Sequence, residues 1–429
     1  MACVRFPYGK EMLEYEIPEA RLQGVLYPEI RNYVPADTEE ALVEKALAAP
    51  VGSMPLAALA EGKEKVVIIA SDHTRPVPSK ILMPRLLREI RKGNPDADIT
   101  ILIATGCHRE TTKEELLAKF GEEIVSNEKI VIHDCDRKEA LSVLGTLPSG
   151  GELKINKLAA EADLLVSEGF IEPHFFAGFS GGRKSVLPGI ASRKTVMYNH
   201  NAAFIDSPYA RTGILLNNPI HRDMLYAAKA AKLQFILNVV IDAEKKIVYA
   251  VSGEPQEAHA EGCAFLREYC GVKADPADIV ITTNGGYPLD QNIYQSVKGM
   301  TAAEAVVKEG GVIIMLAKAN DGHGGESFFR TFQQEKDLKR MTEGFLSTPK
   351  EETIPDQWQS QILARVLMKA RVIYVSDAPD ELVSVFGMIP AHSLPEAVKK
   401  ADTNLAERGI ISAKILAIPD GVSVIAEAE

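Results

Sequence analysis

Residues 65–104, KVVIIASDHTRPVPSKILMPRLLREIRKGNPDADITILIA, contain two short β-branched runs separated by a segment with helical spacing. The runs are Val66–Ala70 and Ile99–Ala104, and nearly every position in them is apolar. Strands of this kind are typical of a parallel sheet that is covered on both faces, and the segment between them predicts a crossover helix. The sequence therefore indicates a strand–helix–strand unit of an α/β fold.

Apolar runs of the same kind recur along the chain, each followed by a helix-like segment. They are Ile130–His133, Ala162–Ser167, Phe235–Ile241, Asp278–Thr282, Val312–Leu316 and Val372–Val375. Val4–Ile17 differs, because its polar and apolar positions alternate, and this predicts a β-hairpin or edge strands. The Gly and Pro within Cys270–Asp278 predict a boundary, after which a second α/β unit begins.

Length, charge and cysteine content narrow the class of protein. A chain of 429 residues suggests two domains, and 46% hydrophobic with 25% charged residues is ordinary for a globular protein. The net charge of −11 argues against a nucleic-acid binder, which needs a basic face. Five cysteines without a CxxC pair argue against a disulfide scaffold and a thiolate zinc site. Neither a signal peptide nor a membrane-spanning stretch is recognisable, so we expect a cytoplasmic protein with no membrane partner.

Polar loops follow four of the predicted strands. They are Ser71–Pro78, Thr105–Arg109, Glu168–His174 and Asn284–Pro288. Because ligands bind beyond the carboxyl ends of strands in open α/β sheets, these loops are the candidate site. In the first of them, Arg75 offers a planar fork that suits a carboxylate or a phosphate. An ordinary loop with an ion pair between Asp72 and Arg75 explains the same residues.

Two of these loops carry a histidine, His108 and His174. Since histidine titrates near neutral pH, two imidazoles facing one substrate can exchange acid and base roles. A single loop histidine is more often solvated or structural, but two at strand ends favour a function. His73 is a further candidate unless it points away from the site, and His133 is best explained as the end of a strand. His200, in a polar loop, carries little signal alone.

Gly178–Ser185, GFSGGRKS, is the densest local signal. Glycines let backbone N–H groups approach an anion, and basic side chains follow them, as at the end of a P-loop. However, Arg183 stands between the last glycine and Lys184, so the strict P-loop spacing fails. Lys184 is instead a candidate for covalent attachment if Arg183 or burial lowers its pKa. A surface turn with solvated charges remains the alternative.

Tyr294–Gly299 leads towards a helix start that Thr301 and Glu304 predict by their capping-box spacing. A cation such as Lys298 near a helix N-terminus suits a bound carboxylate or phosphate, although a solvated lysine is an equal alternative. Trp358 is the only tryptophan, and such a residue more often packs in a core or interface than against a cofactor.

Taken together, the motifs resemble the nickel-dependent lactate racemases. The matching stretches are SDHTRPVP (71–78), TGCHR (105–109), EPHFFAGFSGGRKSVLPGIAS (172–192), TNGGYPLDQNIYQSVKGMTAAEA (283–305), DGHGGE (321–326) and TIPDQW (353–358). The resemblance implies two α/β domains with mostly parallel sheets and an active site in the cleft between them. We expect an N-terminal α/β domain over 1–275, a C-terminal Rossmann-like domain over 276–405, and a tail, 406–429, that returns to the first domain.

The resemblance also implies a covalently bound cofactor, the nickel-pincer nucleotide. This pyridinium-3-thioamide-5-thiocarboxylic acid mononucleotide holds Ni through its sulfur groups. The residue matching its point of attachment, through a thioamide, is Lys184, and His200 matches the histidine that completes the nickel coordination. His108 and His174 match the paired acid/base residues.

Further positions match residues around the cofactor and the substrate. The loop Asp72, His73, Thr74 and Arg75 lies against both of them in the family. Tyr294, Gln295 and Lys298 match substrate-site positions, with Arg75 as a second cation for the substrate. Trp358 matches an aromatic residue near the cofactor.

The implied reaction is the interconversion of D- and L-lactate. The Cα–H of a 2-hydroxy acid is poorly acidic, because the neighbouring carboxylate is already negative. Moving a hydride to the cofactor, while a histidine takes the hydroxyl proton, avoids a carbanion and gives transient pyruvate. Return of the hydride to the other face completes racemisation, which explains why two bases are present.

Several alternatives stay open at this point. The same cofactor could act on malate, a larger 2-hydroxy acid or a sugar acid, with Tyr294 and Phe176 as expected pocket walls. A P-loop-like nucleotide-binding protein and a non-catalytic anion-binding protein belong to different classes. The expected partners are a small 2-hydroxy acid and the enzymes that make the cofactor, but not nucleic acid. A homo-oligomer is left open.

Overall fold

The first sheet forms from the apolar runs of the N-terminal half. In the computed structural model, which describes residues 1–429, its strands are β4 (Lys65–Ser71), β5 (Asp98–Ala104), β6 (Lys129–Ile132), β9 (Leu164–Phe170), β12 (Leu233–Ile241) and β13 (Ile247–Gly253). Their order is β13-β12-β9-β4-β5-β6, and every pair is parallel except β12 with β13. The parallel sheet is the one that the sequence predicts.

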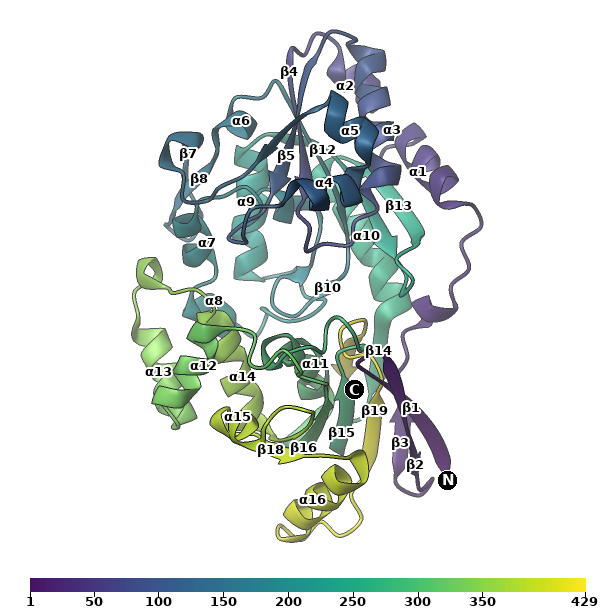
Figure 1. Cartoon of the computed structure of the whole chain (residues 1–429), viewed down its shortest axis with the longest axis vertical. Helices are drawn as coiled ribbons and strands as arrows, with labels where there is room; N and C mark the ends of the chain where they lie inside the picture. The colour runs from purple at the N-terminus through teal and green to yellow at the C-terminus, as the bar shows by residue number, and fades with distance from the viewer.

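Helices cover both faces of this sheet (Figure 1). The helices of the N-terminal half are α1 (Glu39–Ala48), α2 (Leu56–Ala60), α3 (Ser79–Gly93), α4 (Lys113–Phe120), α5 (Glu122–Asn127), α6 (Lys157–Ala160), α7 (Arg193–Asn199), α8 (Ala202–Asp206), α9 (Pro219–Ala230) and α10 (Pro255–Cys270). Of these, α8 lies away from the sheet, against α14 (Gln357–Lys369) of the second half. Alternate residues of β4 enter different cores: Val66 and Ile68 lie in one cluster, whereas Val67 and Ile69 lie in another. This two-sided burial explains why the strand is apolar throughout.

The second sheet lies in the lower part of Figure 1 and is parallel throughout. In spatial order its strands are β18 (Ile389–Ala391), β17 (Arg371–Val375), β16 (Val307–Leu316), β15 (Ala277–Thr283), β19 (Ile415–Ile418) and β3 (Leu22–Val25). Its helices are α11 (Ile293–Val306), α12 (Glu326–Gln334), α13 (Leu338–Ser347), α14 (Gln357–Lys369), α15 (Asp380–Val385) and α16 (Leu394–Ala406). One core cluster contains both Val67 and Val280, so a continuous apolar core joins the two halves.

Four short strand pairs lie outside the two large sheets. They are the hairpin β1 (Ala2–Tyr8) with β2 (Glu11–Ile17), β7 (Leu141–Thr146) with β8 (Glu152–Asn156), β10 (Pro173–His174) with β11 (Gly178–Phe179), and β14 (Gly271–Ala274) with β20 (Ile425–Ala428). The N-terminal hairpin confirms the prediction from the alternating sequence. The 3₁₀ helices are η1 (Glu29–Asn32), η2 (Lys138–Ala140), η3 (Gly182–Ser185) and η4 (Lys350–Glu352).

The two ends of the chain lie differently from the predicted division into 1–275, 276–405 and 406–429. β3 pairs with β19, and the hairpin residue Phe6 packs in the same core as Ile279, so the first strands join the second sheet. The C-terminal segment inserts β19 between β15 and β3, whereas its last strand, β20, pairs with β14, whose residues lie in the predicted first domain. The physical reason is that all four residues of β19 are buried, and a fully apolar strand is best placed inside a sheet.

The helix start predicted at Thr301 is wrong. α11 begins at Ile293, where the side chain of Asn292 accepts the N–H of Gln295 at 3.0 Å. Thr301 lies inside the helix, and its hydroxyl donates to the carbonyl of Lys298 at 2.7 Å. Glu304 does not cap a helix, because it accepts two hydrogen bonds from Arg365. Lys298 is therefore an interior helical residue.

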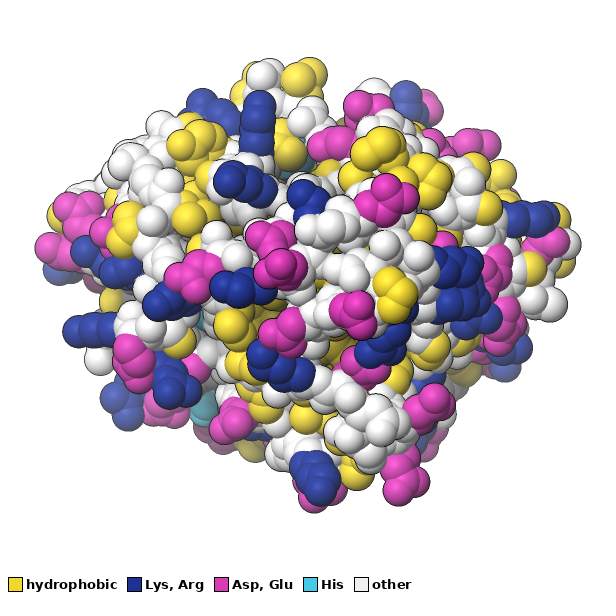
Figure 2. All heavy atoms as spheres, turned by 90° about the horizontal axis from the view of Figure 1, so that it is seen from above, with side chains coloured by type: hydrophobic (Ala, Val, Ile, Leu, Met, Phe, Trp, Pro, Cys, Tyr) yellow, Lys and Arg dark blue, Asp and Glu magenta, His cyan; other side chains and the backbone are white.

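Surface charge is mixed on the face seen from above. Figure 2 shows Lys and Arg side chains interspersed with Asp and Glu across that face. No helix of the chain has both the length and the apolar character needed to cross a bilayer.

Candidate active site

The site begins where three neighbouring strands of the first sheet end. β9, β4 and β5 are consecutive in the sheet and run parallel, so their following loops meet at one edge. These loops carry Glu172 and His174, Asp72 and Arg75, and His108 respectively. The sheet order thus brings together side chains that are up to about 100 residues apart in the sequence.

His108 is held by a buried carboxylate. Its Nδ1 lies 2.7 Å from Oδ2 of Asp72, whose residue is only 1% exposed, while the His108 side chain is 46% exposed. The Thr74 backbone N–H and hydroxyl donate to the other oxygen, Oδ1. Burial raises the pKa of Asp72, but the hydrogen bonds from His108 and Thr74 outweigh burial and hold it below its usual value. Asp72 therefore stays ionised and directs Nε2 of His108 outwards.

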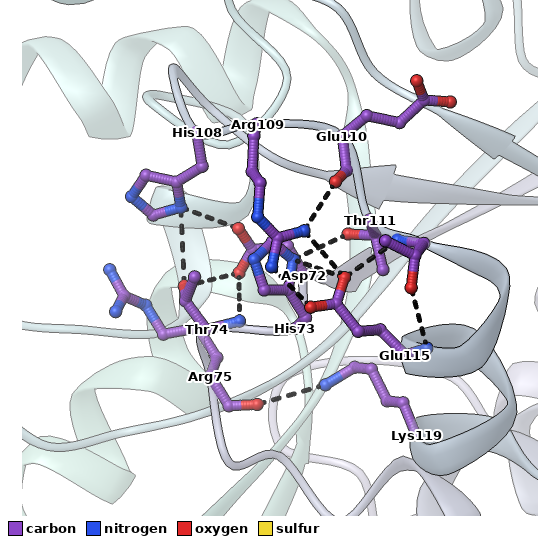
Figure 3. A network of polar contacts seen from close by, with 11 residues as sticks. Asp72, His73, Thr74, Arg75, His108, Arg109, Glu110, Thr111, Glu115 and Lys119 are labelled. Carbon is purple, nitrogen blue, oxygen red and sulfur yellow. Dashed lines mark hydrogen bonds and ion pairs between the residues drawn. The ribbon is translucent and has the colours of Figure 1, made fainter. Parts of the chain in front are cut away.

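In Figure 3, the side chains of the loops after β4 and β5 point in two directions. His108 and the guanidinium of Arg75 project to the same side. His73 turns towards α4 instead, with its Nδ1 3.1 Å from the Thr111 hydroxyl and 3.6 Å from the Glu115 carboxylate. The structure thus directs His108 and the Arg75 guanidinium to one side and His73 to α4.

His174 and Lys184 are in direct contact. Nε2 of His174 lies 3.2 Å from Nζ of Lys184, and the backbone N–H of Ala177 donates to Nδ1 of His174 at 3.3 Å. Since Nδ1 accepts, the imidazole proton is on Nε2, and the Lys184 nitrogen is the acceptor. This arrangement requires the amine of Lys184 to be uncharged.

Electrostatics around Lys184 agree with an uncharged amine. Burial, followed by the positive charges of Arg183 and Arg75, holds the pKa of Lys184 well below its usual value, and Glu172 opposes this only in part. Burial and then the charge of Lys184 also hold the pKa of His174 well below 6.5. Both groups are therefore neutral near pH 7.

His200 follows α7 and presents one free nitrogen. Its Nδ1 donates to the carbonyl of Val196 at 3.0 Å, so Nε2 carries the lone pair and makes no hydrogen bond within the chain. Burial, and then the charge of Lys184, lowers the pKa of His200 to about 3. A buried neutral imidazole with a fixed tautomer is suited to bind a metal ion.

Aromatic rings surround these groups. The ring of Phe176 lies 4.5 Å from His174 and 5.2 Å from His200, between centroids, and 5.7 Å from Nζ of Lys184. Trp358, at the start of α14, lies 5.1 Å from His200, between ring centroids. Because Trp358 comes from the second half of the chain, the site is at the junction of the two halves.

α11 contributes the remaining predicted residues. Burial and the charge of Arg75 lower the pKa of Lys298 to about 8, against the opposing charge of Glu172, so Lys298 lies close to both. The side-chain oxygen Oε1 of Gln295 is buried without a hydrogen-bond partner. The hydroxyl of Tyr294 donates to Asp356 at 2.9 Å.

Two residues of the site escaped the sequence reasoning. Glu172 is the one carboxylate that favours the charged forms of both Lys184 and Lys298, and its position in the loop after β9 was a usable signal. Asp356 adopts a left-handed backbone conformation, φ 66°, which no local pattern indicates. His133 is structural as expected, because Nδ1 accepts from Asn156 and Nε2 donates to the carbonyl of Ala191.

Two α/β units, each built on a mostly parallel sheet, meet at a cluster of histidines and cations and define an α/β enzyme with its site between its two halves. Family models agree: one described as the lactate racemase N-terminal domain matches residues 8–213, and one described as the lactate racemase C-terminal domain matches residues 272–426. The chain belongs to the lactate racemase family and is an isomerase.

Individual relatives are similar over the full chain. The lactate racemase of Thermoanaerobacterium thermosaccharolyticum is 57% identical over 426 residues, 99% of both chains. That of Lactiplantibacillus plantarum is 53% identical and covers 99% of this chain and 100% of its own. The structure of the T. thermosaccharolyticum lactate racemase apoprotein matches with a TM-score of 0.95 over 99% of this chain and 100% of its own. A Thermotoga maritima protein, 20% identical with a TM-score of 0.64, covers 92% of this chain and 100% of its own and shares the fold.

Proposed function

We propose that this chain interconverts D- and L-lactate by reversible hydride transfer to a nickel-pincer nucleotide attached to Lys184, through transient pyruvate. The observation that carries the proposal is the half-buried amine of Lys184, uncharged and 3.2 Å from His174. Both full-length relatives are lactate racemases, which supports lactate as the substrate.

The residues present fit this cofactor. Lys184 offers a nucleophilic amine for a thioamide, and His200 offers a free Nε2 to complete the coordination of nickel. Trp358 and Phe176 bound the space with apolar surfaces. When bound, the group supplies reversible acceptance of a hydride from the substrate Cα.

Attachment at Lys184 changes the state of His174. The free amine accepts the Nε2–H of His174, whereas an amide-type nitrogen has no basic lone pair to accept it. Attachment therefore releases His174 to exchange a proton with the substrate hydroxyl. The apoprotein holds this histidine in an inactive contact.

His108 is the second proton acceptor in the proposal. Asp72 accepts its Nδ1–H, which leaves Nε2 as the basic atom and stabilises the imidazolium that forms. The two histidines differ in their surroundings: His108 is half-exposed beside a carboxylate, and His174 lies among aromatic rings and cations. We propose that each serves one enantiomer.

The substrate carboxylate is held by cations from both halves. Arg75 and Lys298 are close enough for the charge of Arg75 to lower the pKa of Lys298. Neither the Arg75 guanidinium nor the Lys298 amine has a carboxylate oxygen within 4.0 Å. A bound carboxylate would relieve that repulsion. The unpaired Oε1 of Gln295 would gain a partner from the substrate hydroxyl.

Mass and metal analysis of the loaded enzyme tests attachment. Protein co-expressed with the enzymes that make the cofactor should show a covalent adduct and bound nickel. Lys184→Ala should lose the adduct, while the exposed control Lys80→Ala keeps it. Fully active protein of unmodified mass without nickel would overturn the proposal. Polarimetry with lactate, malate and phenyllactate then identifies the substrate, and activity confined to a larger acid would correct it.

A half-reaction, not the overall rate, assigns each histidine to an enantiomer. Enantiomers have equal free energies, so any substitution must change kcat/KM for the two directions by the same factor. In a single turnover, quenched before return of the hydride, His108→Asn should still form pyruvate from one enantiomer, and His174→Asn from the other. Pyruvate formed from both enantiomers by both variants would contradict the two-base mechanism.

A further inference from the structure

Arg183 is the largest fully buried side chain of the protein, with a residue exposure of 1%. Its guanidinium donates to Nδ1 of His221 at 3.0 Å and lies 2.9 Å from Nε2 of His259, an atom that also contacts the Ser180 carbonyl at 2.8 Å. Its other partners are the backbone carbonyls of Ala177 at 2.8 Å, and of Ser180 and Gly181 at 3.3 Å each. No carboxylate pairs with it, which is unusual for a buried arginine.

The three carbonyls all come from the segment between His174 and Lys184. By binding them, Arg183 folds this segment around itself, and His221 on α9 and His259 on α10 fasten it to two helices. The fit is close: a Cβ at Gly182, where φ is +51°, would lie 2.7 Å from the ring of His259. The backbone that leads into the reactive lysine is therefore fixed by one side chain.

The charge of Arg183 is not compensated locally. Burial, then the Arg183 charge itself, lowers the pKa of His221 to about 3 and that of His259 well below 6.5, so both imidazoles are neutral. Arg183, after burial, has the largest effect on the neighbouring amine of Lys184. The other charged or titratable groups that act on that amine are Arg75, Lys298, Glu172, His174 and His200.

We propose that Arg183 is a positioning residue for cofactor attachment: it holds the segment that carries Lys184, and its unpaired buried charge keeps the Lys184 amine uncharged and nucleophilic. This inference rests on the proposed role of Lys184 as the attachment point. It also explains why an arginine precedes Lys184 in a segment whose spacing departs from that of a phosphate-binding loop.

Acetylation of the full-length apoprotein tests the charge effect without any cofactor. Limiting isotope-labelled acetic anhydride is applied across a pH series, and the peptide containing Lys184 is quantified by mass spectrometry against exposed Lys80. Removing the charge in Arg183→Gln should raise the midpoint of Lys184 labelling. A rise of about one pH unit lowers labelling about tenfold at pH values well below both midpoints, and by less near neutral pH. Arg183→Lys, which keeps a cation, should stay close to the parent.

A matched control and a second route protect the test from misfolding. Arg211 is the matched control, because it is also largely buried and donates to backbone carbonyls. Arg211→Gln should leave the labelling of Lys184 unchanged. His221→Glu keeps Arg183 but gives it a counter-charge, and should raise the labelling midpoint, whereas the neutral His221→Gln should not. If Arg183→Gln fails to fold, the His221 pair decides the result alone.

The outcomes separate this inference from the proposed function. Labelling curves that coincide for the parent, Arg183→Gln and His221→Glu in folded protein would overturn the role of Arg183, whatever the cofactor does. A cofactor adduct that survives Lys184→Ala would overturn the proposed function, even if the labelling midpoints shift as expected.

Discussion

Replacement of Asp72 by Asn removes one negative charge and keeps the size of the side chain. Asp72 is 1% exposed and lies 2.7 Å from Nδ1 of His108, so it fixes the orientation and tautomer of that imidazole. A hydrogen bond to a charged group contributes about 1.5–3 kcal/mol, which corresponds to about a 10- to 150-fold change in rate. We therefore expect Asp72→Asn to lower kcat/KM for both enantiomers by at least about tenfold.

Polarimetry on loaded enzyme, with nickel content measured on the same sample, provides the assay. Normalising to nickel separates a loss of catalysis from a loss of cofactor. Asp134→Asn is the control, since Asp134 is an exposed carboxylate beside the structural His133 and should leave the rate unchanged. A normalised kcat/KM for Asp72→Asn equal to that of the parent would refute the argument that the carboxylate supports His108.

Two further predictions concern pH. The pKa of Lys298 is about 8, so its positive charge is present below that pH and is lost as pH rises through it. KM for lactate should rise about tenfold towards pH 9, and the rise should be absent in Lys298→Met but kept in Lys80→Met. His259 has a folded-state pKa below its unfolded value near 6.5, so its stabilising contribution is complete above that pH and declines as pH falls. As the pH falls from 7 to 5, the apoprotein should lose more stability than His259→Gln in urea unfolding, and equal losses would contradict the assignment.

The parallel sheets were predictable because their strands are buried on both faces. Runs such as Val66–Ala70 are apolar at consecutive positions, and in a protein of this composition a short run of this kind predicts a strand buried on both faces. The pairing of β3 with β19 was not predictable, since each strand has four residues and the pairing joins segments about 390 residues apart. The start of α11 was misplaced because Thr301 and Glu304 have capping-box spacing, yet each finds its partner elsewhere.

The site was predictable where the sheet determines it. His108 and His174 follow β5 and β9, which are separated in the sheet only by β4. The strand-end argument therefore identified both histidines without comparison to a related protein. The contact of His200 with Trp358 depends on how α7 and α14 pack across the two halves. Spacing within a short stretch of sequence does not predict such a contact. Only the resemblance to a family indicated those two residues.

The Gly-rich segment shows why a phosphate-binding loop was a reasonable but incomplete interpretation of GFSGGRKS. In a phosphate-binding loop the backbone N–H groups stay free for the anion. Here the N–H groups of Ser180, Gly182 and Lys184 donate within the protein, to Glu172, Asn238 and Gly181. The helix that follows, η3, has only four residues and so carries little dipole. The same glycines and cations therefore fix a lysine: close backbone approach makes room for the Arg183 guanidinium, and its charge acts on the next side chain.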